Sequence, residues 1–309
     1  MKAAADCGRQ HNPEEEARVE KRRLIGCCGV AVLAVLAARG MAEGKAGAVD
    51  SSRLVREVVY NELHDHDTHG YWRYWIERRT AKATLMQEQV ETAEGPIQRL
   101  ELANGRPLDE AARADEDRRL EHLLNSPSEQ AQHRKEYAED ERRIGRILAL
   151  LPEAFLYEPA VVEGGNYHLR FRPNPDYPVH TIESRIFHAM AGDLWISVQS
   201  KHLVKLEGKL QENVDFGYGL LGRLYKDGWF RLERTRATNA AGQTDWKTER
   251  LEVHMQGRAM LFKTIARETS EVRSGFRAVP QGLTLQQAAS LMGTADVAQV
   301  RQASFNGMR

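Results

Sequence analysis

The sequence predicts an α+β protein built on one large antiparallel sheet, and three observations lead to this prediction. Long stretches of alternating polar and apolar residues, rich in aromatic and β-branched side chains, follow one another through most of the chain. Turn residues such as Asn104-Gly105 end or separate these stretches, so neighbouring strands would pair as antiparallel hairpins. Helical periodicity is confined to a segment before the strands, an insertion among them and a short segment after them.

The composition is that of a soluble globular protein with enough residues for a sizeable core. The 309 residues include 44 basic and 44 acidic side chains, so no net charge directs the chain towards nucleic acid. Apolar residues make up 41% of the chain and charged residues 28%, which argues against a wholly disordered protein. Because Cys7, Cys27 and Cys28 are the only cysteines, the rest of the chain cannot form a disulfide framework, a thiolate metal site or a catalytic thiol.

Residues 1–48 are predicted to be an N-terminal extension that contains an export signal. The basic triplet Lys21-Arg22-Arg23 precedes an apolar run, Leu24–Ala38, and small residues follow at plausible cleavage positions. The run is too short, and too soon followed by Arg39, for a comfortable transmembrane helix. We therefore expect a periplasmic or secreted protein after cleavage of the signal.

Three alternatives remain open for this N-terminal segment. A signal peptide does not need the polar, acidic stretch before the basic triplet, so translation would begin further along the chain, near Val19. The string LIGC, which ends at Cys27, is similar to a lipoprotein box, although this cysteine opens the apolar run instead of following it. A buried core helix is the third alternative, and the flanking basic triplet and Gly/Ala-rich run disfavour it.

The first predicted elements of the body are a helix and three strands. From Val49 onwards apolar residues recur at three- and four-residue spacing, behind Asp50, Ser51 and Ser52, which can cap a helix. The polar stretch HDHDTHG ends this periodicity, and the stretch YWRYWIERRTAKATLMQEQVE then predicts two long antiparallel strands. A third strand, IQRLELA, ends at the Asn104-Gly105 turn.

Residues 107–151 are predicted to form a charged helical hairpin inserted into the sheet. The segment is rich in Glu, Arg and Ala, and Pro127 divides it into helices over about Asp109–Asn125 and Ser128–Leu151. Apolar residues are sparse until Ile144, so most of the hairpin should be solvated. A charged helix face of this kind is more often a wet surface than a binding patch, and each charge pair adds only about 0.2–0.5 kcal/mol.

Strand patterns dominate again from Leu156 onwards, and a single domain is predicted over residues 49–292. The stretch NYHLRFRPNP alternates, SRIFHAMAGDLWISVQSKHLVKLEGKLQENV predicts a pair of strands, and another hairpin turns at Asn239–Gly242. The stretch RAMLFKTIARETSEVR predicts the last long strand, which Pro280 and a short helix over Thr284–Leu291 follow. The tail, residues 293–309, has no interpretable pattern.

Three stretches of the second half carry a resemblance to known proteins. In AGDLWISVQSKHLVKLEGKL, the segment Leu194–Ser197 turns tightly into Leu203–Gly208, and the stretches VDFGYGLLGRLYKDGWFRLERT and TERLEVHMQGRAMLFKTIARETS follow. Over residues 157–270 the chain resembles exported proteins that sort or carry outer-membrane lipoproteins, and an uncharacterised exported family of that architecture. The resemblance implies a half-barrel, which is a partially closed antiparallel sheet curled round an apolar cavity beneath helices.

This resemblance has limits that the residues themselves show. Ser197 stands where the carriers have an acidic residue, and the insertion at residues 107–151 has no counterpart in them. Because the carriers are binding proteins and not enzymes, the resemblance implies no catalytic residues.

The densest set of potential metal ligands lies in the stretch HDHDTH. His64, His66 and His69, with Asp65 and Asp67 between them, offer nitrogen and oxygen ligands for a divalent metal. Adjacent residues at a helix-to-strand junction can direct only some of their side chains to one point, so a solvated polar hinge is the favoured interpretation. A metal site at these three histidines is the alternative.

Other motifs give no support for catalysis. G-x-S-x-G and H-E-x-x-H are absent, and VEGGN lacks the Lys and Ser/Thr of a phosphate-binding loop, so it predicts a hairpin turn. GYGLLG, residues 217–222, predicts a β-bulge or a barrel corner, with the lip of a cavity as the alternative. No cofactor is expected from these motifs.

Aromatic residues are the best candidates to line a cavity in the sheet. Such residues bury a large area and most often fill a core, whereas in a curled open sheet they can also surround a guest molecule. The candidate ligand-binding residues are Trp72, Tyr74, Trp195, Phe216, Tyr218, Trp229 and Trp246.

The sequence therefore predicts an exported, non-catalytic protein that binds a lipid or acyl chain in a sheet cavity, with a role in envelope lipid or lipoprotein handling. The helical insertion would contact an envelope protein partner or cover the mouth of the cavity. One alternative is a metal-dependent exported hydrolase that uses His64, His66 and His69. A second is a structural envelope protein that works through the insertion. Neither a cofactor nor a nucleic-acid partner is expected.

Overall fold

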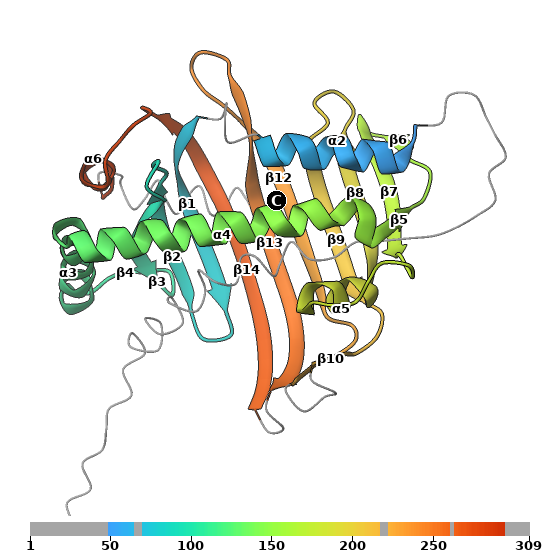
Figure 1. The fold of residues 1–309 in the computed structure, drawn as a ribbon. Coiled ribbons are helices and arrows are strands. Elements are labelled where there is room, and N and C mark those ends of the chain that lie inside the picture. Colours follow the sequence, from blue (N-terminus) through green and yellow to red (C-terminus); the bar gives the residue numbers. More distant parts are fainter. Residues whose placement is uncertain (1–48, 65–69, 217–221, 260–262, 294–309) are drawn as a thin grey trace, which may run out of the picture.

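The computed structural model describes residues 49–64, 70–216, 222–259 and 263–293 (Figure 1). These residues confirm the predicted α+β fold, with a large curved antiparallel sheet that does not close on itself. The helices are α2 (Ser51–His64), α3 (Glu110–Asn125), α4 (Pro127–Ala154), α5 (Ile182–His188) and α6 (Leu285–Leu291). The strands are β1 (Tyr71–Thr80), β2 (Thr84–Val90), β3 (Ile97–Ala103), β4 (Arg106–Pro107), β5 (Phe155–Tyr157), β6 (Val161–Glu163), β7 (Asn166–Pro173), β8 (Met190–Ser197), β9 (Leu203–Leu210), β10 (Val214–Phe216), β11 (Gly222–Leu224), β12 (Trp229–Thr238), β13 (Thr244–Ala259) and β14 (Lys263–Val279).

The sheet brings the first and last long strands of the body together. Its order is β4-β3-β2-β1-β14-β13-β12-β9-β8-β7-β5, with β6 beside β7 and the β10–β11 hairpin attached to β13. Strand β1 pairs with β14 from Tyr71 opposite Val279 to Thr80 opposite Thr269. The two runs of strands that the helical insertion separates in sequence therefore form one continuous sheet.

Helices α2, α4 and α5 lie on the same side of the sheet, which we call the helix-covered face (Figure 1). The main core lies between these helices and β7, β8, β9 and β12. Helix α2 buries the apolar residues whose spacing predicted it, Leu54, Val55, Val58 and Val59. In α5 the fully buried Phe187 meets Phe155 edge-on, with 4.8 Å between the ring centroids. This core holds the largest group of buried apolar side chains in the described part of the chain.

The helical insertion is part of the fold. Helices α3 and α4 are confirmed, and α4 is a 28-residue helix that crosses the helix-covered face (Figure 1). Its C-terminal end buries Ile147, Leu151 and Ala154 in the main core, where the apolar residues of the insertion are concentrated. Helix α3 places Leu120 against a separate small cluster with α6, β2 and β3. None of the described helices is long and apolar enough to span a membrane.

The prediction from sequence is wrong at helix α5. The stretch SRIFHAM was assigned to a strand, whereas Ile182–His188 is helical and β8 begins at Met190. Thr181 starts the helix, because its side chain accepts a hydrogen bond from Ser184 N while the Ser184 side chain accepts one from the backbone of Thr181. Seven residues are too few for a helical period to stand out among strands.

The interior near β1, β2 and β14 is charged. Glu271 of β14 is 3% exposed and accepts hydrogen bonds from Arg78 (2.9 Å) and Arg273 (2.6 Å). Burial by itself would raise the pKa of the Glu271 carboxyl, but the positive charges of Arg273 and Arg78 outweigh it and lower the pKa to about 2. Glu88 of β2 is likewise fully buried and pairs with Arg73. These ion pairs fill a region where alternation alone predicts apolar residues.

Candidate functional site

The predicted aromatic residues do not gather in one cavity. Trp72 and Tyr74 are 1% and 3% exposed and belong to a small buried cluster with Ile76 and Ala237. The Trp72 indole N–H donates to Asp245 Oδ2 at 2.6 Å, and burial raises the pKa of the Tyr74 hydroxyl. These two residues therefore fill the interior between β1 and the β12–β13 hairpin.

Trp195 and Trp229 alternate with the buried core residues Leu194 and Phe230, so they lie on the other face of the sheet from the main core. None of the described helices covers this face at β8, β9, β12 and β13 (Figure 1), and we call it the helix-free face. The Trp195 ring stacks on His168, with 4.6 Å between centroids, and Lys205 Nζ lies 4.5 Å from its centroid. Trp229 stacks more loosely on His254, at 6.0 Å, and is 38% exposed.

The remaining three aromatic candidates occupy different places. The Trp246 indole N–H donates to Ser200 Oγ at 3.2 Å, and Phe216 packs against the main core from β10. Tyr218 lies outside the described residues. The predicted set thus divides between the core, the helix-free face and a hairpin.

The histidine cluster is described only at its first member. His64 ends α2, where its Nδ1 lies 2.7 Å from the Tyr60 carbonyl oxygen and its ring stacks on the Tyr60 ring at 4.1 Å. His66 and His69 lie outside the described residues, so the metal site stays a prediction. Within the described ranges no group of three or more His, Cys, Asp or Glu side chains could hold a metal ion.

The helix-covered face carries a set of half-buried apolar side chains next to the main core, which we call the apolar strip. Its members are Phe216, Leu224, Leu251, Val253 and Met255. Strand register explains their position, since Leu251 and Val253 lie opposite the buried Leu232 and Phe230 and share their face.

Glycines bring the strands and side chains of this region close together. A Cβ at Gly228 would lie 2.7 Å from Met255 Sδ, and one at Gly257 would lie 2.4 Å from the Arg223 carbonyl oxygen. Gly257 therefore permits an approach of β11 that a larger residue would prevent, whereas a side chain at Gly228 would require the flexible Met255 side chain to shift. The apolar strip is a continuation of the core that remains partly exposed.

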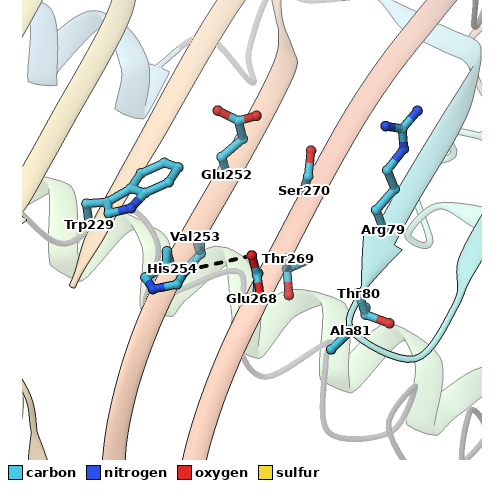
Figure 2. A pocket seen from close by; sticks show the side chains of 10 residues that line it. All are labelled: Arg79, Thr80, Ala81, Trp229, Glu252, Val253, His254, Glu268, Thr269 and Ser270. Atoms are coloured by element: carbon cyan, nitrogen blue, oxygen red, sulfur yellow. Dashed lines mark ion pairs between the residues drawn. The ribbon is translucent and has the colours of Figure 1, made fainter.

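An open pocket of about 410 Å³ lies on the helix-free face, between β12, β13, β14 and the end of β1 (Figure 2). Figure 2 shows Trp229 and His254 on one side and Arg79 with Thr80 on the other. The register places His254 opposite both Trp229 and Glu268, and Ser270 opposite both Glu252 and Arg79. Side chains on alternate positions share a face, so Val253 and Thr269 contribute mainly main chain to this pocket.

The carboxylates of the pocket lie at long distances from three neighbouring basic side chains. Glu252 lies 3.6 Å from Arg250 Nη1 and 3.9 Å from Arg231 Nη1. Glu268, whose side chain is 72% exposed, lies 3.9 Å from His254 Nδ1. These distances exceed those of a hydrogen bond, so the carboxylate oxygens can accept hydrogen bonds from a ligand.

Sequence analysis identified Trp229 as a candidate but missed the polar residues of this pocket. Glu252, His254 and Glu268 stand in strands that alternate polar and apolar residues, so alternation could assign them to a wet face. Their convergence depends on the pairing of β12, β13 and β14, which a single sequence does not reveal.

Comparison of the chain with models of protein families, with curated proteins and with solved structures gives no match. The resemblance to lipoprotein-sorting and lipoprotein-carrier proteins therefore stays a prediction from sequence.

Proposed function

We propose that this protein is an exported, non-catalytic binding protein whose helix-covered face binds an acyl chain or another apolar ligand at the apolar strip. The observation that carries the proposal is that Phe216, Leu224, Leu251, Val253 and Met255 extend the sealed core yet remain half-buried. An apolar ligand that covers partly exposed apolar surface next to a core removes that surface from water, which favours binding.

The magnitude of this effect sets the affinity expected for a short acyl segment. Each methylene group removed from water contributes about 0.8 kcal/mol, so a chain that buries about ten of them gains about 8 kcal/mol. The loss of translational and rotational freedom offsets at least about 4 kcal/mol of that gain. The remainder is at most about 4 kcal/mol, which corresponds to a dissociation constant of about 1 mM. Pre-formed strands keep the affinity near this limit because little further ordering is needed.

The helical insertion supports a role as a cover over this face. Helix α4 crosses the helix-covered face and buries Ile147 and Leu151 against the sheet, so it is held in place by the core. An arm that recruits an envelope partner would instead need an unpartnered apolar surface. The proposed export rests on the basic triplet and apolar run within residues 21–38, and a role in envelope lipid or lipoprotein handling follows from it.

Titration of the full-length protein with a fluorescent fatty acid tests the proposal. Wild-type protein should show saturable binding, and Met255→Gln should weaken it about fivefold, because a polar amide of similar size replaces the thioether. The matched control is Gln256→Met, since Gln256 is the next residue on β13 and is exposed. Binding that is absent from the wild type, or equally weak in both variants, would overturn the proposal.

A further inference from the structure

The pocket on the helix-free face combines an exposed indole with carboxylates. Trp229 is 38% exposed, and Glu252 and Glu268 lie across β13 and β14 from it (Figure 2). The basic residue of the lining, Arg79, pairs with Glu77 of its own strand. Arg250 and Arg231 lie 3.6 and 3.9 Å from Glu252 and offset part of its charge. The negative charge of the pocket is therefore concentrated at the exposed carboxylate of Glu268.

A second tryptophan on the same face, Trp195, contacts a basic side chain of the protein itself. Trp195 has Lys205 as its cross-strand neighbour on β9, and Lys205 Nζ lies 4.5 Å from the ring centroid. His168 stacks on the same indole from β7. The chain thus places its own ammonium group over this indole, in the geometry of a cation–π interaction.

Trp229 also has a lysine as its cross-strand neighbour, but this lysine pairs with a carboxylate instead of the indole. Lys209 of β9 lies opposite Trp229, as Lys205 lies opposite Trp195. The Lys209 ammonium instead pairs with Asp227 at 2.7 Å, and this hydrogen bond lowers the pKa of the Asp227 carboxyl. Lys209 is therefore drawn towards the turn before β12 and away from the Trp229 indole. The Trp229 ring stacks loosely on the neutral or protonated ring of His254, at 6.0 Å between centroids, so a cation from outside the chain would approach the indole beside this histidine.

We propose that this pocket binds a compact organic cation, namely an ammonium group with small alkyl substituents. The indole of Trp229 would contact the alkylated ammonium, and the carboxylates of Glu252 and Glu268 would balance its charge. A volume of about 410 Å³ accommodates such a group with part of the molecule that carries it. The same group occurs on free amines such as choline and on lipid headgroups, and both present the same chemistry to the pocket.

A titration of the full-length protein with choline, followed through the side-chain N–H resonances of its five tryptophans, tests this proposal. Choline should shift the resonance that Trp229→Leu removes, and this variant should weaken binding about tenfold, equivalent to about 1.4 kcal/mol. Trp195→Leu is the matched control on the same face, and it should change the dissociation constant less than about twofold.

The charge requirement is tested separately. The uncharged isostere 3,3-dimethylbutan-1-ol should bind about tenfold more weakly than choline. Glu268→Gln changes an exposed side chain without threatening the fold and should weaken choline binding about threefold. If Trp195→Leu causes the same loss as Trp229→Leu, if the isostere binds as well as choline, or if choline shifts no tryptophan resonance, the proposal is wrong.

Vesicles distinguish the two sources of the ammonium group. Phosphatidylcholine vesicles that bind the protein and release it on addition of choline would identify a lipid headgroup as the ligand. Binding of choline without any binding of phosphatidylcholine vesicles would identify a free amine. Equal binding of phosphatidylglycerol vesicles, unaffected by choline, would show that the pocket does not bind the headgroup and would rule out a lipid as its ligand.

Discussion

The two halves of the sheet are stabilised by different means. Around β7, β8, β9 and β12, the buried side chains are apolar, and Phe187, Phe230 and Met190 are among the largest of them. Around β1, β2, β3 and β14, the buried side chains include glutamates, among them Glu88 and Glu271, paired with arginines. One continuous sheet thus joins an apolar half to a charged half.

The contrast between the apolar half and the charged half indicates which part of the sheet is suited to the proposed apolar ligand. The apolar strip borders the apolar half, where a guest extends a surface that already excludes water. The charged half contains buried ion pairs such as Glu271 with Arg78 and Arg273, and a guest that separated one pair would leave a buried charge without compensation. The charged half is therefore suited to a rigid structural role, and the apolar half to the proposed binding of an apolar ligand.

Removal of a large side chain from the apolar half should have the largest effect. Phe187→Ala in α5 leaves a cavity beside Phe155 and should lower the free energy of unfolding by about 4 kcal/mol. Urea denaturation followed by circular dichroism measures this change. A loss below about 1 kcal/mol would show that the core under α5 is loosely packed.

Removal of one charge from the charged half should have a somewhat smaller effect. Glu271→Gln leaves the half-buried guanidinium groups of Arg78 and Arg273 without their carboxylate and should lower the free energy of unfolding by about 3 kcal/mol. The same denaturation experiment measures it. An unchanged midpoint would mean that these ion pairs contribute little, and the contrast between the two halves would lose its basis.

Acid should act on the charged half through the same carboxylate. The pKa of Glu271 is about 2 in the folded protein, below its ordinary value of 4.5, so its stabilisation is present above pH 4.5 and is lost as the pH falls towards 2. Between pH 5 and pH 3 the wild type should lose about 2 kcal/mol that Glu271→Gln does not lose. Parallel pH dependence of the two proteins would contradict this assignment.

A capping residue of the apolar half should matter less. Thr181→Ala removes the side chain that accepts from Ser184 N at the start of α5, and the expected loss is about 1 kcal/mol. Thr181→Ser should retain most of this stability because serine caps helices as well as threonine does. A serine variant as unstable as the alanine variant would show that the methyl group, and not the hydroxyl, is important.

An exposed ion pair of the insertion should matter least. The side chains of Arg118 and Asp115 in α3 are 68% and 49% exposed, so Arg118→Ala should change the free energy of unfolding by less than about 0.5 kcal/mol. Thermal denaturation at low and high salt measures this. A larger loss would indicate that α3 contributes more through its charges than its solvated face implies.

Local patterns predicted the elements well where one residue type repeats over a long segment. The spacing of Leu54, Val55 and Val58 predicted α2, and the Glu/Arg-rich composition with Pro127 predicted both helices of the insertion. Gly164-Gly165 forms the predicted hairpin turn, with both residues at positive φ (56° and 78°). Helix α5 was missed because its evidence is a short capping box and not a period.

The candidate site could be predicted only in part, because alternation within a strand does not say which strand lies beside it. Trp72 and Tyr74 are two residues apart and share a face, as alternation requires. Trp195 and Trp229 lie on the other face from them, and this follows only from the pairing of β1 with β14. Similarly, Glu252 and Glu268 line one pocket with Trp229 through pairings across β12, β13 and β14, which no local pattern specifies.

Photo-crosslinking with a diazirine-bearing fatty acid, followed by mass spectrometric mapping of the labelled residues, is the decisive test of acyl-chain binding at the apolar strip. We expect saturable labelling at Leu251, Val253 and Met255 that excess unlabelled fatty acid removes. Labelling confined to the helix-free face at His254 or Glu268, or labelling that does not saturate, would contradict it.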